Sequence, residues 1–366
     1  MGGIVLCLTG DVMTGRGVDQ VFSSPGDPRL WERYVDDART YVELAKAASG
    51  AIPAPVDFAW PWGDALQVMD QMGPDLRVIN LETSITTSDD AAPGKAVHYR
   101  MHPDNIGCLA AARPDACVLA NNHVLDLGVP GLEDTLDVLA RAGLATAGAG
   151  RDAEEAWRPL ELHPDHRRVL LWSVGASCSG VPSTWAAGTK KPGVAFVGDL
   201  SPAAAQDLCD RVRRTKQPGD IAVVSIHWGS NWGYAVPRTQ VLFAHWLIDA
   251  GVDVVHGHSS HHPRPVEMYR GRPVLYGCGD FVDDYEGITG YEEYRDELRL
   301  ACLLSVGADT GRTAALRMVP LRARRMRLEA AAPEEREWLR ETLDRVSDAD
   351  IALDAAGALT VSCAGP

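Results

Sequence analysis

Short apolar runs that stop at polar clusters recur along the chain, a pattern typical of buried strands that end in loops. These runs cover residues 4–8, 76–81, 116–120, 168–175, 221–226, 252–255, 273–276 and 298–306. Helical spacing of apolar residues predicts helices over residues 30–48, 64–72, 131–140, 202–214, 239–250 and 333–348. The alternation of strands and helices predicts an α/β fold in which helices cover a sheet.

Polar side chains follow the predicted strands at the points where those strands end. They are Asp11, Glu82, Asn122, His123, His227, His258 and His261. The carboxyl ends of parallel strands meet at one edge of a sheet, so we expect these side chains to lie close together. Taken singly, Asp11 also fits a turn or helix-cap residue, and residues 256–262 also fit a histidine-rich surface loop. Their convergence favours a metal site or acid/base chemistry.

Composition narrows the classes of partner. The formal net charge is −15, which argues against a nucleic-acid or anionic-membrane surface, because such partners need a basic face. The eight cysteines show no CxxC spacing and read as reduced thiols. No stretch approaches the ~18 uninterrupted apolar residues of a membrane span, and no targeting signal is apparent. The expected location is therefore the cytoplasm.

A chain of 366 residues can form one or two domains. We predict one catalytic domain over residues 1–320 and a helical or irregular C-terminal extension over residues 321–366 that packs on it. The oligomeric state does not follow from the pattern.

Six ordered motifs carry a resemblance to a known family. They are GDVM-x-GR at residues 10–16, NLE at 80–82, NNH-x-x-D-x-G at 121–128, IHWG at 226–229, GH-x-x-H at 257–261 and Y-x-x-G-x-F at 276–281. Over residues 4–285 this order resembles the CapA-like branch of the calcineurin-like metallophosphoesterases. The resemblance implies a four-layer α/β/β/α sandwich with a metal site at the strand ends. The metal ligands that it implies are Asp11, Glu82, Asn122, His227, His258 and His261, with His123 as the acid/base histidine.

The chain departs from that branch at three positions. Ser259 replaces an imidazole of the usual GHHPH, Asp280 replaces the asparagine of the usual GNF, and Met13 stands where broader metallophosphoesterases carry a histidine ligand. Fewer imidazoles and more oxygen favour Ca²⁺, Mn²⁺ or Mg²⁺ over Zn²⁺. The same changes argue against a complete two-metal centre. No organic cofactor is expected.

Two enzymatic functions fit this pattern. The first is a metal-dependent hydrolase of phosphate esters or of a peptide-like bond, in which His123 protonates the leaving group. The second, which we favour at this stage, is an epimerase resembling the soluble CapA-like proteins that invert the Cα of the C-terminal tryptophan of lasso-peptide precursors. Its expected catalytic residues are His123, Asp11, Asp126, His261 and Asp280. A non-catalytic binding module is a third alternative.

In the epimerase, His123 oriented by Asp11 or Asp126 would serve one face of Cα, and His261 or His258 oriented by Asp280 would serve the other. The expected partner is the precursor peptide, with neither nucleic acid nor membrane involved. The expected substrate-binding residues are arginines for the terminal carboxylate and tryptophans for the indole. They are Arg16, Arg100, Arg264, Trp60, Trp62 and Trp228.

Overall fold

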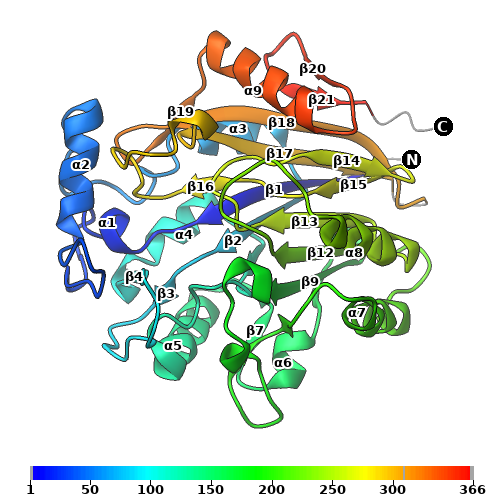
Figure 1. Cartoon of the computed structure of the whole chain (residues 1–366), viewed down its shortest axis with the longest axis horizontal. Helices are drawn as coiled ribbons and strands as arrows, with labels where there is room; N and C mark the ends of the chain where they lie inside the picture. The colour runs from blue at the N-terminus through cyan, green and yellow to red at the C-terminus, as the bar shows by residue number, and fades with distance from the viewer. Residues whose placement is uncertain (1–2, 308–309, 363–366) are drawn as a thin grey trace.

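The computed structural model describes residues 3–307 and 310–362, and it contains two large β-sheets flanked by helices (Figure 1). The first sheet has ten strands in the order β20-β21-β18-β17-β1-β2-β5-β6, with β16 paired to β1 and β19 paired to β18. Its strands are β1 (Ile4–Val12), β2 (Leu76–Leu81), β5 (Ala116–Val118), β6 (Thr146–Ala147), β16 (Asp280–Val282), β17 (Leu298–Val306), β18 (Thr313–Ala323), β19 (Leu328–Ala330), β20 (Ile351–Leu353) and β21 (Leu359–Val361). β1, β2, β5 and β6 are parallel to one another. β17 runs antiparallel to β1, and β18 runs antiparallel to β17.

The second sheet has seven strands in the order β11-β9-β12-β13-β15-β14, with β8 paired to β9. Its strands are β8 (Leu160–Leu162), β9 (Val169–Ala176), β11 (Phe196–Val197), β12 (Ile221–His227), β13 (Val254–His258), β14 (Val266–Tyr269) and β15 (Arg272–Leu275). The central strands β9, β12, β13 and β15 are parallel. Two short pairs lie outside both sheets: β3 (Ser84–Ile85) with β4 (Arg100–Met101), and β7 (Ala149–Gly150) with β10 (Gly193–Val194).

The α-helices lie between and around these strands. They are α1 (Arg16–Asp19), α2 (Arg39–Ser49), α3 (Asp64–Met72), α4 (Gly107–Ala112), α5 (Gly128–Arg141), α6 (Ala153–Trp157), α7 (Pro202–Thr215), α8 (Arg238–Asp249) and α9 (Pro333–Val346).

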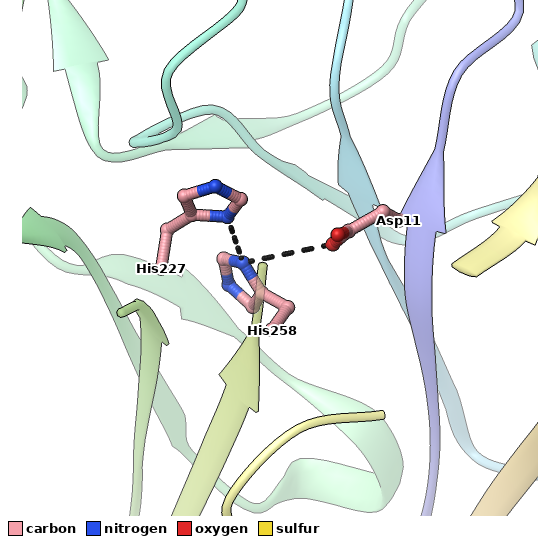
Figure 2. Close-up of side chains that lie close together, drawn as sticks. All are labelled: Asp11, His227 and His258. Atoms are coloured by element: carbon pink, nitrogen blue, oxygen red, sulfur yellow. Dashed lines mark hydrogen bonds and ion pairs between the residues drawn. The ribbon is translucent and has the colours of Figure 1, made fainter. Parts of the chain in front are cut away.

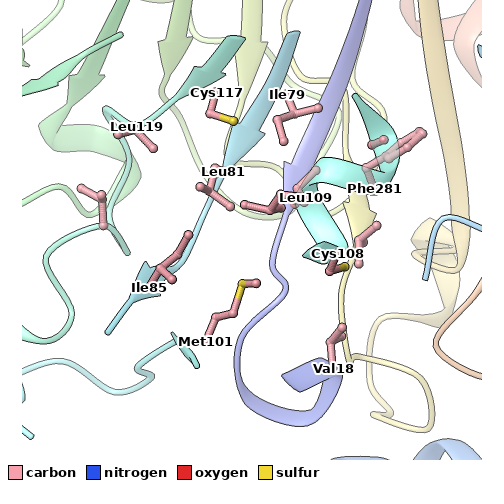
Figure 3. Packing of buried hydrophobic residues seen from close by; sticks show 14 of the residues in the cluster. Val18, Ile79, Leu81, Ile85, Met101, Cys108, Leu109, Cys117, Leu119 and Phe281 are labelled. Carbon is pink, nitrogen blue, oxygen red and sulfur yellow. The ribbon is translucent and has the colours of Figure 1, made fainter. Parts of the chain in front are cut away.

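The buried side chains form three clusters that define the layers. Alternate residues of β1 point to opposite faces, so Leu6 and Leu8 pack against the second sheet while Cys7 packs on the helix side. Figure 3 shows part of this helix-side packing, with Leu81 of β2 beside Leu109 of α4 and Cys117 of β5 in the same cluster. A third cluster joins the outer face of the second sheet to α7 and α8. The order of layers is therefore helix, sheet, sheet, helix.

The predicted α/β class is confirmed, and the eight predicted strand runs all contain strands. The helix expected over residues 30–48 is wrong in its first part, because Arg29 and Asp37 form an isolated β-bridge and α2 begins only at Arg39. The expected division at residue 320 falls inside β18, and β19, β20 and β21 add to the first sheet. The domain division itself stays a prediction.

Two other expectations concern the whole chain. The seven cysteines among the described residues are free thiols, and Cys363 lies outside those residues. Within residues 3–307 and 310–362, none of the helices has the length and apolar character needed to cross a bilayer.

Candidate metal and catalytic site

Asp11, His227 and His258 converge from three strands that belong to two different sheets (Figure 2). Nδ1 of His227 lies 2.8 Å from Nδ1 of His258, and Oδ1 of Asp11 lies 3.9 Å from the same His258 nitrogen. All three side chains are buried. The β12–β13 register pairs His227 with His258, so the parallel sheet itself places the two imidazoles side by side.

The hydrogen bonds around these imidazoles fix which nitrogens face each other. Nε2 of His227 donates to Oδ1 of Asn122 at 2.9 Å, and Nε2 of His258 lies 2.9 Å from the Ser225 hydroxyl. Burial lowers the pKa of both histidines, so both are neutral. With its Nε2 hydrogen committed, His227 presents a lone pair at Nδ1, as a metal ligand does.

A second cluster, formed by Asp11, His261 and Asp280, shares its aspartate with the first. Nδ1 of His261 lies 2.9 Å from Oδ1 of Asp280, while Oδ2 of Asp280 is buried and has no hydrogen-bond partner among the residues that the structure describes. The sequence departures at Ser259 and Asp280 therefore still leave candidate metal ligands on this side of the site. Asp280 supplies a carboxylate beside His261, which weakens the expectation that a second ion would lack ligands.

Negative charge is crowded at the junction of the two clusters. Burial, and next the repulsion of Asp280, raises the pKa of Asp11 to about 7. Burial and the repulsion of Asp11 raise the pKa of Glu82 well above its usual range. Burial disfavours the charged form of His261, but the Asp280 carboxylate outweighs this and raises the pKa of His261. A bound divalent cation would relieve this crowding, and the orphaned Asp280 oxygen and the facing imidazoles fit such an ion.

Amide side chains and one strained residue hold the carboxylates in place. Nδ2 of Asn80 donates to Oδ1 of Asp11 at 2.7 Å and to Oε2 of Glu82 at 2.9 Å. The Ser259 N–H donates to Oδ2 of Asp11 at 3.2 Å, and Ser259 has φ of 105°, which non-glycine residues rarely adopt. Asn80 and Ser259 thus fix two oxygens of the same carboxylate from opposite sheets.

His123 forms a hydrogen-bonded dyad with Asp126 at the edge of a cavity of about 200 Å³. Nδ1 of His123 donates to Oδ2 of Asp126 at 2.6 Å, and Nε2 lies 3.9 Å from Oε1 of Glu82. Nζ of Lys95 pairs with the other Asp126 oxygen at 2.5 Å. Burial lowers the pKa of His123 to about 4, against the attraction of Asp126. At neutral pH the imidazole is therefore uncharged, with its Nε2 lone pair available.

The structure brings the expected ligands and the expected catalytic histidine to one place. The cavity is lined by Glu82, Asn122, His123, His227, His261 and others, and Asp11, His258 and Asp280 lie directly behind it. Two further histidines of the 256–262 segment are structural. His256 bonds the Thr9 carbonyl at 2.9 Å, and His262 accepts from the Gly233 N–H at 3.1 Å. The roles of the individual residues remain predictions.

None of the six expected substrate-binding residues lines this cavity. The three tryptophans instead form hydrogen bonds within the fold. The indole N–H of Trp62 donates to the Cys108 carbonyl, and that of Trp60 donates to the Arg325 carbonyl. The indole N–H of Trp228 donates to the Tyr276 carbonyl.

The arginines differ from one another. Arg16 is buried against Asp284 and Glu32, and Arg100 pairs with Asp89. Arg264 is buried, with no carboxylate partner among the described residues.

Three cavity residues escaped the sequence reading. Lys95 lies in an aperiodic loop, Asn231 follows the IHWG motif, and Tyr285 follows the last motif. The amide of Asn231 bonds Nε2 of His261 at 2.9 Å, and the Tyr285 hydroxyl bonds that of Tyr99 at 2.9 Å. Their closeness in sequence to the motifs was the available signal for Asn231 and Tyr285. Lys95 offered none.

Residues 5–285 match the family model described as "Bacterial capsule synthesis protein PGA_cap". The chain belongs to this family. Among its relatives is a probable polyglutamine synthesis accessory protein of Mycobacterium tuberculosis, 54% identical over 94% of this chain and 91% of that one. Another is the PGA biosynthesis protein CapA of Bacillus subtilis, 26% identical over 78% of this chain and 64% of that one. The expected CapA-like branch is thereby confirmed.

The preferred expectation of a lasso-peptide epimerase is wrong. A relative that is 54% identical over nearly the whole PGA_cap chain is named for polyglutamine synthesis, and other relatives are named for capsule biosynthesis. The epimerase assignment rested on Ser259, Asp280 and context. The structure does place Asp280 against His261, as that hypothesis expected, but the same contact belongs to a cluster that fits a metal ion. The precursor peptide and the isomerase chemistry therefore lose their support.

Proposed function

We propose that this PGA_cap protein is a metal-dependent hydrolase that cleaves amide bonds in a glutamine- or glutamate-based polymer, as an accessory to the synthesis of that polymer. The observation that carries the proposal is that the His123–Asp126 dyad and the two Asp11 clusters border the same cavity. A base, a set of metal ligands and a space for substrate are the parts that amide hydrolysis needs.

His123 acts first as a base. Its Nδ1 hydrogen is held by Asp126, so Nε2 accepts the proton of a water that attacks the amide carbonyl. The imidazolium then gives this proton to the departing amine nitrogen. In the hydrolase expected from the sequence, His123 protonates the leaving group. Its pKa of about 4 favours the neutral form before the attack, so we give it the role of base as well.

The divalent ion would be held by His227, His258 and Asp11, with Asp280 and His261 on the other side of Asp11. The chemistry that an ion held there would supply is polarisation of the amide carbonyl and a lower pKa for water at the site. The residues around it keep the geometry: Asn80 and the Ser259 N–H hold Asp11, and Asn122 holds His227. The identity of the metal, the number of ions and the number of their ligands are part of the proposal.

Support for an amide substrate comes from the relatives, whose names refer to the synthesis of polyglutamine. The cavity itself argues against tight binding of a phosphate by protein groups alone. Lys95 is the lysine that lines it, and its ammonium is already paired with Asp126. A hydrolase that trims or releases chains would serve as an accessory to a polymerising enzyme, since both enzymes act on the same backbone bond.

The test is hydrolysis in H₂¹⁸O. The Mn²⁺-loaded protein is incubated separately with a γ-linked glutamate oligomer, an α-linked glutamine oligomer and bis(p-nitrophenyl) phosphate. Mass spectrometry should find one ¹⁸O in each new carboxylate of an oligomer, with no cleavage by the His123→Ala variant. Release of nitrophenolate without cleavage of either oligomer would move the protein to phosphoester chemistry. Absence of all three reactions would remove the hydrolase proposal.

A further inference from the structure

A second and larger cavity, of about 740 Å³, lies beside the catalytic one. Its walls are mostly apolar and come from the starts of α7 and α8, with Leu200, Pro202, Pro237, Leu242 and Trp246 among them. Gly229 and Ser230 line this cavity, whereas Asn231, the next residue, lines the catalytic one. A single loop after β12 therefore separates the two spaces. Figure 1 shows α7 and α8 on the same side of β12.

Two polar side chains lie at the Gly229 end of this cavity: Gln240 lines it, and Arg264 lies behind its wall at Gly229. Gln240 is 1% exposed, and neither its Oε1 nor its Nε2 has a hydrogen-bond partner among the described residues. Arg264 is 2% exposed, and within residues 3–307 and 310–362 its Nε and Nη1 also lack partners. Nε2 of Gln240 and Nη1 of Arg264 lie 2.7 and 2.9 Å from the position that a Cβ on Gly229 would occupy. Both groups thus lie beside Gly229, a residue of the cavity wall.

Burying a guanidinium without a carboxylate partner costs folding free energy, and this chain has 50 aspartates and glutamates that could supply one. In the part of the chain that the structure describes, the guanidinium of Arg264 nevertheless donates only to the Ala235 carbonyl, through Nη2. The first turns of α7 and α8 add the positive ends of two helix dipoles to the same cavity. Asp199 also lines the cavity, and its carboxylate accepts the Ser201 N–H. The helix N-termini, with Arg264 behind Gly229, make one end of the cavity positive, while its walls are mostly apolar and one lining residue, Asp199, is acidic.

We propose that the α7–α8 cavity binds an organic carboxylate, with the carboxylate toward Gln240 and Arg264 and the carbon chain against the apolar walls. This deepens the proposed function and rests on it for the identity of the ligand: a glutamyl unit adjoining the scissile bond of the polymer. Gly229 and Ser230 line one cavity and Asn231 the other, so the two cavities adjoin, as the binding of neighbouring units of one chain requires. Arg264 is then a specificity-determining residue for an acidic polymer.

The test compares two small probes on the metal-loaded, full-length protein by isothermal titration calorimetry. They are N-acetylglutamate and its neutral diamide, which differ in charge and hardly in shape. The wild type should bind the carboxylate about tenfold more tightly than the diamide or better, as expected for charge-assisted hydrogen bonds. Equal affinities for the two probes would overturn the proposal.

Two variants assign the binding to this cavity. Gln240→Glu is nearly isosteric and places a carboxylate beside Arg264, so the variant should keep or raise its Tm while losing about tenfold in affinity for N-acetylglutamate. Thr239→Trp changes an exposed residue of the cavity wall and should lower the affinity by filling the space. Unchanged affinity in both variants would place the carboxylate elsewhere and end the proposal.

The outcome is separable from that of the proposed hydrolysis. A carboxylate preference that disappears in Gln240→Glu, together with no cleavage of any oligomer, would keep the binding site and remove the hydrolase. Cleavage of the oligomers with equal affinity for both probes would do the reverse.

Discussion

Asp11 and Asp280 are register partners on the parallel strands β1 and β16. Two carboxylates in such positions point to the same side of the sheet, and here both reach the buried space beside His261. Their mutual repulsion in that space contributes to the raised pKa of Asp11. The pair explains how a single substitution in the last motif alters the electrostatics of the first.

Asp280→Asn should weaken divalent metal binding. The variant removes one anionic ligand candidate from the cluster with Asp11 and His261 but keeps the size of the side chain, so the fold should survive. We expect the affinity for Mn²⁺ to fall about tenfold or more, measured by calorimetry on the metal-free protein. Asp104→Asn, at a carboxylate that is 73% exposed, is the control and should bind Mn²⁺ like the wild type. An unaltered affinity in Asp280→Asn would exclude Asp280 from the metal site.

Metal binding should release protons below neutral pH. Asp11, with its pKa raised from 3.8 to about 7, is protonated in the metal-free protein at pH 6, and a cation must displace that proton. The affinity for Mn²⁺ should therefore rise with pH up to about 7, and titrations in two buffers of different ionisation enthalpy should count the protons. A constant affinity between pH 5.5 and 7 would contradict the crowding of carboxylates.

The raised pKa of Asp11 also makes the stability of the metal-free protein depend on pH. Because the folded-state pKa of Asp11 lies above its unfolded value, its contribution to stability is fully present below pH 3.8 and is lost as the pH rises through about 7. A bound cation removes this loss. Metal should therefore raise the Tm more at pH 8 than at pH 5 as far as Asp11 is concerned.

Residues at strand ends were predictable from the sequence, because the signal for each one is local. An apolar run that stops at Asp11 or at His227 identifies both the strand and the side chain at its end, and the structure brings those side chains together. Partners that lie far apart along the chain were not predictable. Arg16 seemed free to bind a substrate, yet it pairs with Asp284, which is 268 positions away in the sequence.

The expectation that the tryptophans bind substrate was wrong for a different reason. Trp60 and Trp62 lie in a loop-like sequence that suggested a pocket, but burial of a large aromatic side chain is favourable wherever its N–H finds an acceptor. Trp62 found the Cys108 carbonyl and is fully buried. Lys95 was missed because a lysine in an aperiodic loop normally points to solvent. Its pairing with the buried Asp126 is a tertiary contact that no local pattern encodes.

Lys95→Met should shift the pH dependence of hydrolysis. The ammonium of Lys95 is one of the charges that lower the pKa of His123, so its removal should raise that pKa and move the acid limb of kcat/KM to higher pH. Lys216→Met is a matched control, since Lys216 pairs with the buried Asp253 away from the cavity. His123→Ala should lower kcat by about 10²- to 10⁴-fold with the fold intact. An identical acid limb in Lys95→Met and the wild type would disconnect Lys95 from the base.

Arg299→Met should be strongly destabilising, because Arg299 and Asp283 form an ion pair in which both side chains are almost fully buried, 1% and 2% exposed. Removing the cation leaves a buried carboxylate uncompensated, which costs about 3–5 kcal/mol in the free energy of unfolding. Arg39→Met breaks an exposed pair with Asp37 and should cost at most about 1 kcal/mol. Urea unfolding of both variants at pH 8 provides the comparison.

Since burial already raises the pKa of Asp283 to about 7, the Arg299→Met variant should recover part of its stability at pH 5.5, where that carboxyl is protonated. Adding Asp283→Asn should also restore stability at pH 8, and a double variant no more stable than Arg299→Met would show that the loss comes from packing rather than from the unpaired charge.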